Sequence, residues 1–280
     1  MKPVEALQAD GWHAALRLDF AGTQQRSWLA RRQHRGPLLV QRPFYPEGDE
    51  VCQVVIVHPP GGIAGGDVLD IDVSTGGHAC AQLTTPGAGK WYRGFGREAR
   101  QSVRIQVADG ALCEWLPQEN IVFDGALANM SLEVDLTGNA TFCGWDFTCL
   151  GRPASGERFD DGVLRQRTVI RRDGRTSFRE QAVIEAANEQ RNAATVLADF
   201  TAYGSMFVVG GERDEEILSS AQAVFLHCTN AGVTWVNNTL VARWVGRSTE
   251  EGRALFAQLW AVLRPWYAGR AALMPRIWAT

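Results

Sequence analysis

The sequence lacks the clustered ligands of a tight metal site. Its six cysteines never form a C-x-x-C pair, and its five histidines form neither an i, i+4 pair nor an H-E-x-x-H motif. Zinc sites depend on such clusters, so we expect no tight structural or catalytic metal site and no tightly bound cofactor. Cysteines scattered in this way are typical of reduced thiols that are buried as small hydrophobic side chains.

Long apolar runs and long runs of one charge are also missing. No stretch approaches the roughly 20 apolar residues that span a bilayer, and the first residues do not have the pattern of a signal peptide. The 28 basic residues nearly balance the 31 acidic residues. This balance argues against nucleic acid or a membrane surface as the main partner. We therefore expect a cytoplasmic protein.

Enzyme motifs are absent as well, although two glycine-rich segments resemble phosphate-binding loops. They are residues 58–67 and 84–93. A P-loop needs a glycine five positions before the glycine of its Gly-Lys pair and a hydroxyl residue after that pair, but Thr84 and Trp91 stand there. The residues after Gly66 alternate like a strand, whereas a dinucleotide fingerprint opens a helix. We expect these glycines to shape the backbone, and we predict no enzymatic activity.

The hydrophobic pattern predicts a mainly β protein. With 280 residues, 45% of them hydrophobic, the chain can bury a substantial core, and we expect a single domain over residues 1–280. Short alternating runs separated by turn residues indicate layered sheets, with a hairpin turn at Asp173-Gly174. The clearest runs are residues 52–57, 68–73, 103–107, 130–136, 142–150 and 168–172.

A small helical element is predicted near the C-terminus. Residues 212–223 have the pattern of a short helix. Residues 248–251, Ser-Thr-Glu-Glu, match a capping box ahead of a second helix. The apolar stripe of this second helix is expected to face the core and consists of Leu255, Phe256, Leu259, Trp260, Leu263 and Trp266.

Four acidic residues share strand parity with apolar neighbours and should therefore point inward. They are Asp67, Glu114, Asp146 and Glu180. A buried carboxylate must pair with a cation, accept hydrogen bonds, become protonated or line a wet cavity. Two hypotheses remain open for these residues: structural pairs with arginine or backbone amides, or a shared water-filled passage.

Six segments together carry a family resemblance over nearly the whole chain. They are the two glycine-rich segments and residues 41–46, 115–119, 149–157 and 274–278. In this order they resemble the UreD family of urease accessory proteins, also called UreH. The resemblance implies a β-helix-like fold of stacked sheets. It also implies a non-enzymatic scaffold that loads nickel into apo-urease together with UreF, a helical accessory protein, and UreG, a GTPase.

The resemblance also gives the inward acids a function. The family is thought to offer nickel a route towards urease, so the acids could line an internal passage in which weak oxygen ligands hand on a transient nickel ion. Asp67, Asp146 and Glu180 are the first candidates and Glu114 is the last. The alternative is a metallochaperone that binds nickel directly and has no passage.

The C-terminal tail combines arginine with aromatic residues, the types that dominate protein interfaces. It supplies the candidate partner-binding residues Arg264, Trp266, Tyr267, Arg276 and Trp278. Packing of the tail on its own domain is the alternative hypothesis.

Overall fold

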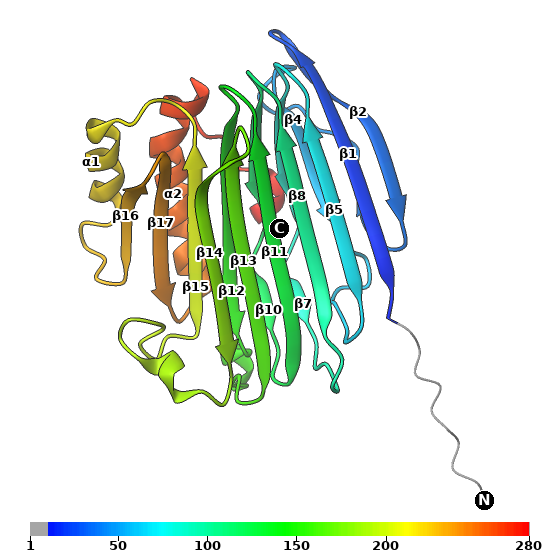
Figure 1. The fold of residues 1–280 in the computed structure, drawn as a ribbon, viewed down its shortest axis with the longest axis vertical. Helices are drawn as coiled ribbons and strands as arrows, with labels where there is room; N and C mark the ends of the chain where they lie inside the picture. The colour runs from blue at the N-terminus through cyan, green and yellow to red at the C-terminus, as the bar shows by residue number, and fades with distance from the viewer. Residues whose placement is uncertain (1–10, 280) are drawn as a thin grey trace, which may run out of the picture.

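The computed structural model describes residues 11–279, which form two stacked β-sheets with helices on one side (Figure 1). From β4 to β13 the longer strands alternate between the sheets, and neighbouring strands within each sheet run parallel. Each coil of the chain thus adds one strand to each sheet, as in a β-solenoid. The predicted mainly β, β-helix-like fold with late helices is confirmed.

Both sheets have antiparallel strands outside their parallel centres. In spatial order the first sheet consists of β14 (Arg175–Glu185), β13 (Gly162–Arg172), β11 (Ala126–Leu136), β8 (Ala99–Val107), β5 (Val68–Thr75), β1 (His13–Thr23) and β2 (Arg26–Arg35). The second sheet consists of β16 (Ala231–Val236), β17 (Thr239–Gly246), β15 (Ala202–Val209), β12 (Thr141–Leu150), β9 (Leu112–Leu116), β6 (Cys80–Thr84), β4 (Cys52–Val57) and β3 (Leu39–Val40). In addition β10 (Asn120–Val122) pairs with β12, and β7 (Gly89–Trp91) pairs with β10.

The second sheet is the middle layer and is buried on both faces. One face packs against the first sheet through side chains such as Val54 and Phe142. The other face packs against α2 (Thr249–Ala268), where Phe147 meets Phe256 with ring centroids 4.9 Å apart. Because the middle sheet has two apolar faces, an inward side chain on it can point into either of two different cores.

The helices lie beside β16 and β17 in Figure 1. α1 (Glu215–Val224) begins three residues later than predicted, and its N-cap Asp214 accepts hydrogen bonds from the backbone N–H groups of Glu216 and Ile217. α2 begins directly after Ser248, as predicted. The predicted capping box is wrong, since the Ser248 side chain makes no capping hydrogen bond. Within residues 11–279 no helix has the length and apolar character needed to cross a membrane.

Local turn chemistry follows the sequence closely. Asp173 and Gly174 have positive φ angles of 49° and 75° between the antiparallel strands β13 and β14, so the predicted hairpin turn is confirmed.

The six cysteines are free, as predicted. Four of them are buried, and Cys80 and Cys228 are half-buried.

Candidate functional site

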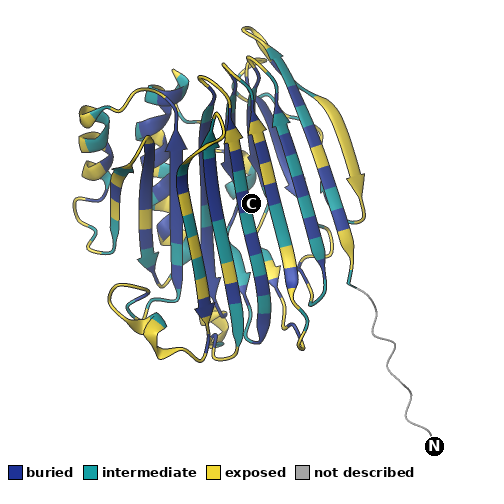
Figure 2. Cartoon of the chain, in the orientation of Figure 1, coloured by how far each residue is buried: buried dark blue, intermediate teal, exposed yellow. Residues whose placement is uncertain are grey.

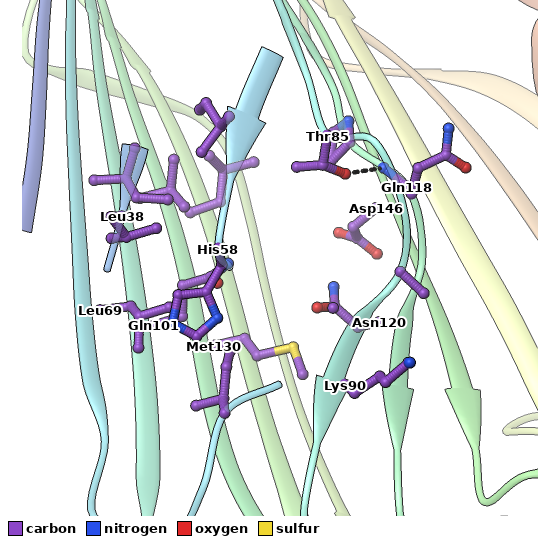
Figure 3. A pocket seen from close by; sticks show the side chains of 18 of the residues that line it. Leu38, His58, Leu69, Thr85, Lys90, Gln101, Gln118, Asn120, Met130 and Asp146 are labelled. Carbon is purple, nitrogen blue, oxygen red and sulfur yellow. Dashed lines mark hydrogen bonds between the residues drawn. The ribbon is translucent and has the colours of Figure 1, made fainter. Parts of the chain in front are cut away.

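A cavity of about 360 Å³ lies between the two sheets. Its wall includes apolar side chains such as Leu69 and Met130 and polar side chains such as His58, Asn120 and Asp146 (Figure 3). Both glycine-rich segments border it, through residues 61–63 and 85–90. Because Gly61, Gly87 and Lys90 are also exposed to solvent, this end of the cavity lies at the surface.

The two glycine-rich segments are held together by their backbones. The N–H group of Ile63 donates to the carbonyl of Lys90 at 2.7 Å, and the N–H group of Tyr92 donates to the carbonyl of Ile63 at 2.9 Å. A Cβ atom at Gly62 would lie 2.3 Å from the Tyr92 ring, so glycine is required for this close approach. The expectation that these glycines shape the backbone agrees with this geometry.

Asp146 is the acid that faces this cavity. Its strand β12 directs Trp145 and Phe147 towards α2, so the alternation of the strand places Asp146 on the side of the first sheet. Figure 3 shows its side chain near Gln118 and Asn120, across the cavity from His58. Among the residues that the structure describes, none forms a hydrogen bond or ion pair with the Asp146 carboxylate.

The electrostatics of Asp146 follow from this placement. Burial, followed by the negative charge of Glu180, raises the pKa of Asp146 to about 7 from its usual 3.8, and Arg243 opposes the shift. Burial also lowers the pKa of His58, against the opposing charge of Asp67. Near neutral pH the cavity therefore presents a carboxyl group that exchanges its proton and an imidazole that favours its neutral form.

Glu180 lies at the side of this region, on β14. Its carboxylate pairs with the Arg243 guanidinium of β17 at 3.1 Å, and the side chains are 29% and 58% exposed. Strand register links this pair to the cavity wall, because Thr168, which lines the cavity, is the direct neighbour of Glu180. On the second sheet Ser205 stands between Asp146 and Arg243. Asp146 and Glu180 thus belong to one polar region between the sheets.

Several polar residues of this region lie outside the sequence-based prediction, which uses inward parity for acids alone. Gln166 and Thr168 share parity with the buried Leu164 and Ile170, so the same rule applied to amides and hydroxyls would have identified them. Gln166 donates to the Thr148 hydroxyl at 3.0 Å and accepts from the Tyr203 hydroxyl. No sequence pattern of this kind would have identified Asn120 or Arg243.

Asp67 has a different environment, in the turn before β5. The carboxylate is 8% exposed and accepts 2.8 Å hydrogen bonds from the backbone N–H groups of Trp12 and Ala64, one on each oxygen. It does not line the cavity. This arrangement closes the turn that carries the chain into β5 and matches the backbone-amide alternative.

Glu114 lies on the opposite face of the second sheet, against α2. The Arg264 side chain, which is 0% exposed, donates to both carboxylate oxygens at 3.0 Å. Trp260, Tyr267 and Gln82 donate three further hydrogen bonds to Glu114, at 2.9, 2.5 and 2.8 Å. Its carboxylate is therefore fully occupied by donors of the protein itself.

A second carboxylate completes this network. Glu47 accepts two hydrogen bonds from Arg264, at 2.7 and 2.9 Å, and the carbonyl of Ala271 accepts another from Arg264 at 2.7 Å. Burial alone would lower the pKa of Arg264, but the charge of Glu114 and the contacts with Glu47 outweigh it and raise that pKa. We refer to Glu47, Glu114, Trp260, Arg264 and Tyr267 as the α2 network.

The candidate partner-binding residues of the tail contact their own domain to different extents. Arg264 and Tyr267 are buried in the α2 network, so a partner cannot reach them in this conformation. Trp278 is half-buried and donates from its indole nitrogen to the Thr84 hydroxyl at 2.8 Å. Trp266 is half-buried, and only Arg276 is exposed.

Comparisons with known proteins agree on one family. The profile described as "UreD urease accessory protein" matches residues 13–279. Similar proteins include urease accessory proteins UreD from Azoarcus sp. and Methylobacillus flagellatus, 47% and 45% identical, with 96% of this chain and 95% of each relative covered. A UreD 2 protein from Brucella anthropi is 44% identical, with 96% of this chain and 99% of the relative covered.

Proposed function

Because this chain belongs to the UreD family of urease accessory proteins and takes part in urease maturation, we propose that it is a scaffold through which nickel passes to the enzyme. In this proposal it binds UreF, UreG and apo-urease and performs no catalysis itself. Nickel is cargo, and the cavity between the sheets forms part of its path.

The observation that carries the proposal is the unpartnered carboxyl group of Asp146 on the cavity wall. Asp146 is half-buried, and the charge of Arg243 acts on it without forming an ion pair, so an ionised carboxylate here is costly unless water or a transient ion solvates it. A pKa of about 7 means that a divalent ion can displace the proton near neutral pH. Oxygen ligands hold such an ion loosely, which suits transfer better than storage.

The route we propose begins at the end of the cavity formed by the glycine-rich segments. There the His58 imidazole offers a neutral nitrogen ligand, and the Asn120 amide oxygen, which accepts a 3.0 Å hydrogen bond from the Trp91 indole, has a second lone pair for an ion. Asp146 follows deeper in the cavity. Glu180 lies beyond Thr168 and leads towards the edge formed by β14 and β17. The half-exposed ion pair with Arg243 leaves Glu180 able to exchange partners.

We assign structural functions to the other two acids. Asp67 fixes a turn through two backbone amides, and Glu114 anchors α2 through Arg264. An ion at either position would have to compete with bonds that the protein already makes. Of the four inward acids, only Asp146 and Glu180 therefore belong to the proposed passage.

The test is the nickel content of urease coproduced with UreF, UreG and variants of this chain. Asp146→Ala and Glu180→Ala should each lower nickel per urease several-fold, while the melting temperature does not fall and the partners still copurify. Glu185→Ala is the matched control, because Glu185 is an exposed acid on the same strand as Glu180.

Fully loaded urease with both variants would rule out the passage. Loss of melting temperature together with loss of the complex would instead assign these acids a structural function. Tight nickel binding by the isolated chain that survives both substitutions would favour the direct metallochaperone.

A further inference from the structure

The edge strand β2 carries an unusual concentration of positive charge. Its ten residues include four arginines and one histidine but no acid, although the chain as a whole has a net charge of −3. Within the described residues, Arg31, Arg32 and Arg35 form no ion pair. The acid opposite Arg31 is Asp19, which pairs with Arg17 at 3.2 Å.

Both faces of this strand are open to solvent over its second half. Residues 30–35 are all exposed, and Figure 2 shows the contrast with the neighbouring strand β1. Arg32 and His34 stand opposite the buried Leu18 and Leu16, so their side chains share the face that elsewhere forms the core. The positive charge is therefore presented on both sides of one extended backbone.

The outer backbone edge of β2 already binds a peptide group at its start. The N–H group of Ser27 donates to the carbonyl of Asp49 at 2.8 Å, in the direction away from β1. The strand then has one unpaired residue, Ala30, where the register with β1 shifts. From Arg31 to Arg35 it pairs regularly with β1, and no described segment pairs with its other edge.

The other sheet edges are tied to neighbouring structure. On β14, at the opposite end of the first sheet, the carbonyl of Ser177 accepts from the Asn237 side chain at 3.0 Å, and Glu180 pairs with Arg243. In the second sheet β16 packs against α1, and β3 has only two residues. Among the described strands, β2 combines length, exposure and charge of one sign.

We propose that residues 31–35 of β2 are a docking edge for an extended acidic segment of a partner protein, which adds to the first sheet as a further strand. The peptide groups of that segment would bond to the free edge of β2, and its acidic side chains would pair with arginines on both faces. The docking edge is independent of the proposed nickel route.

The chemistry of the strand favours this occupant over two others. A second copy of this chain would place arginine rows against each other, and like charges at adjacent strand positions destabilise pairing. A nucleic acid would use the charges but not the aligned backbone donors and acceptors. Arginine on an edge strand also discourages aggregation, and the experiment must separate this effect from docking.

The experiment measures binding of fluorescein-labelled peptides to the full chain by fluorescence anisotropy. The probes are an alternating Glu-Val peptide, the same peptide with alternate backbone amides N-methylated, a Lys-Val peptide and labelled oligothymidylate. We expect only the unmodified acidic peptide to bind well. Arg31→Glu/Arg35→Glu should weaken it about tenfold or more, and hydrogen exchange should slow at residues 31–35 on binding.

The matched control is Arg175→Glu/Arg179→Glu, which makes the same charge change on exposed arginines of β14 at the other end of the sheet. This control should leave the affinity unchanged. Arg31→Gln/Arg35→Gln provides a milder variant, and a melting temperature for each variant confirms folding.

Three outcomes would overturn the proposal. Equal affinity for the N-methylated peptide would show that charge alone acts, without strand addition. Binding of oligothymidylate as tight as that of the acidic peptide would indicate a general polyanion surface. Failure of the acidic peptide to bind at all would leave the arginines with the function of preventing edge-to-edge aggregation.

Discussion

The two faces of the second sheet place an inward-facing acid in opposite environments. On the helix face, Glu114 accepts five hydrogen bonds and pairs with a fully buried arginine. On the cavity face, Asp146 has no described partner, and its pKa is raised to about 7. The two acids lie on adjacent strands, β9 and β12, so the difference comes from the layer that covers each face.

This difference separates stability from transfer. A carboxylate surrounded by fixed donors holds two layers together but has no capacity left for another ligand. A carboxylate at a cavity does not stabilise the fold through fixed hydrogen bonds, and it remains able to bind and release ions or protons. In this chain the closed acid secures α2 on the sheet, and the open acid is the one available for chemistry.

The largest expected effect is on the helix face, from Arg264→Met. This substitution leaves Glu114 and Glu47 without their buried cation and should destabilise the fold by about 3 to 5 kcal/mol. Urea unfolding measures this loss. The double variant Glu114→Gln/Arg264→Met should be less destabilised than the sum of the two single variants, because each single change strands a charge.

Additive losses would contradict the coupling between Glu114 and Arg264. They would mean that the helix face is held mainly by apolar packing around residues such as Phe256 and Trp260. Glu114 and Asp146 would then differ in their hydrogen-bond partners but not in their contribution to the free energy of unfolding.

On the cavity face, we expect Asp146→Asn to affect the free energy of unfolding in the opposite direction from Arg264→Met. Between pH 3.8, where the unfolded carboxyl ionises, and about 7, the folded state retains a proton that the unfolded state has lost. Stability therefore falls as pH rises through this window, by at most about 4 kcal/mol at roughly 1.4 kcal/mol per pKa unit. The asparagine variant should lack this part of the pH dependence and be at least as stable at pH 8.

Urea unfolding of the wild type and Asp146→Asn from pH 4 to pH 8 provides the test. Glu185→Gln is the control, since this exposed acid on β14 should leave the profile unchanged. A parallel loss of stability at every pH would show that Asp146 makes a structural bond, and the cavity face would then resemble the helix face.

Sequence patterns account for the strands and turns but not for the different environments of Glu114 and Asp146. Alternation located the strands, and Asp173-Gly174 located a hairpin. Parity correctly placed Glu114 and Asp146 inward, yet in a middle layer both parities are buried, so parity alone does not identify the covering layer. The partner of Glu114 is 150 residues away in the chain, and a pairing of that range depends on the complete assembly of the three layers.

A smaller effect should come from Glu180→Gln, which sharpens the comparison within the cavity face. Removing this negative charge should lower the pKa of Asp146 below about 7, because Glu180 contributes to raising it. Stability should change by less than about 1 kcal/mol, since the ion pair with Arg243 is substantially exposed. Carboxyl-carbon NMR measures the pKa of Asp146. An unchanged pKa in the Glu180→Gln variant would show that the charge of Glu180 does not act on Asp146.

The smallest effect is expected at the start of α2, from Ser248→Ala. The helix begins after Ser248, but this side chain makes no capping hydrogen bond, so its loss should cost less than about 0.5 kcal/mol. Asp214→Ala is the matched comparison at α1, where the carboxylate does cap the helix, and it should cost about 1 kcal/mol. Urea unfolding resolves the two. A Ser248→Ala loss as large as that of Asp214→Ala would show that the Ser248 hydroxyl caps the start of α2 after all.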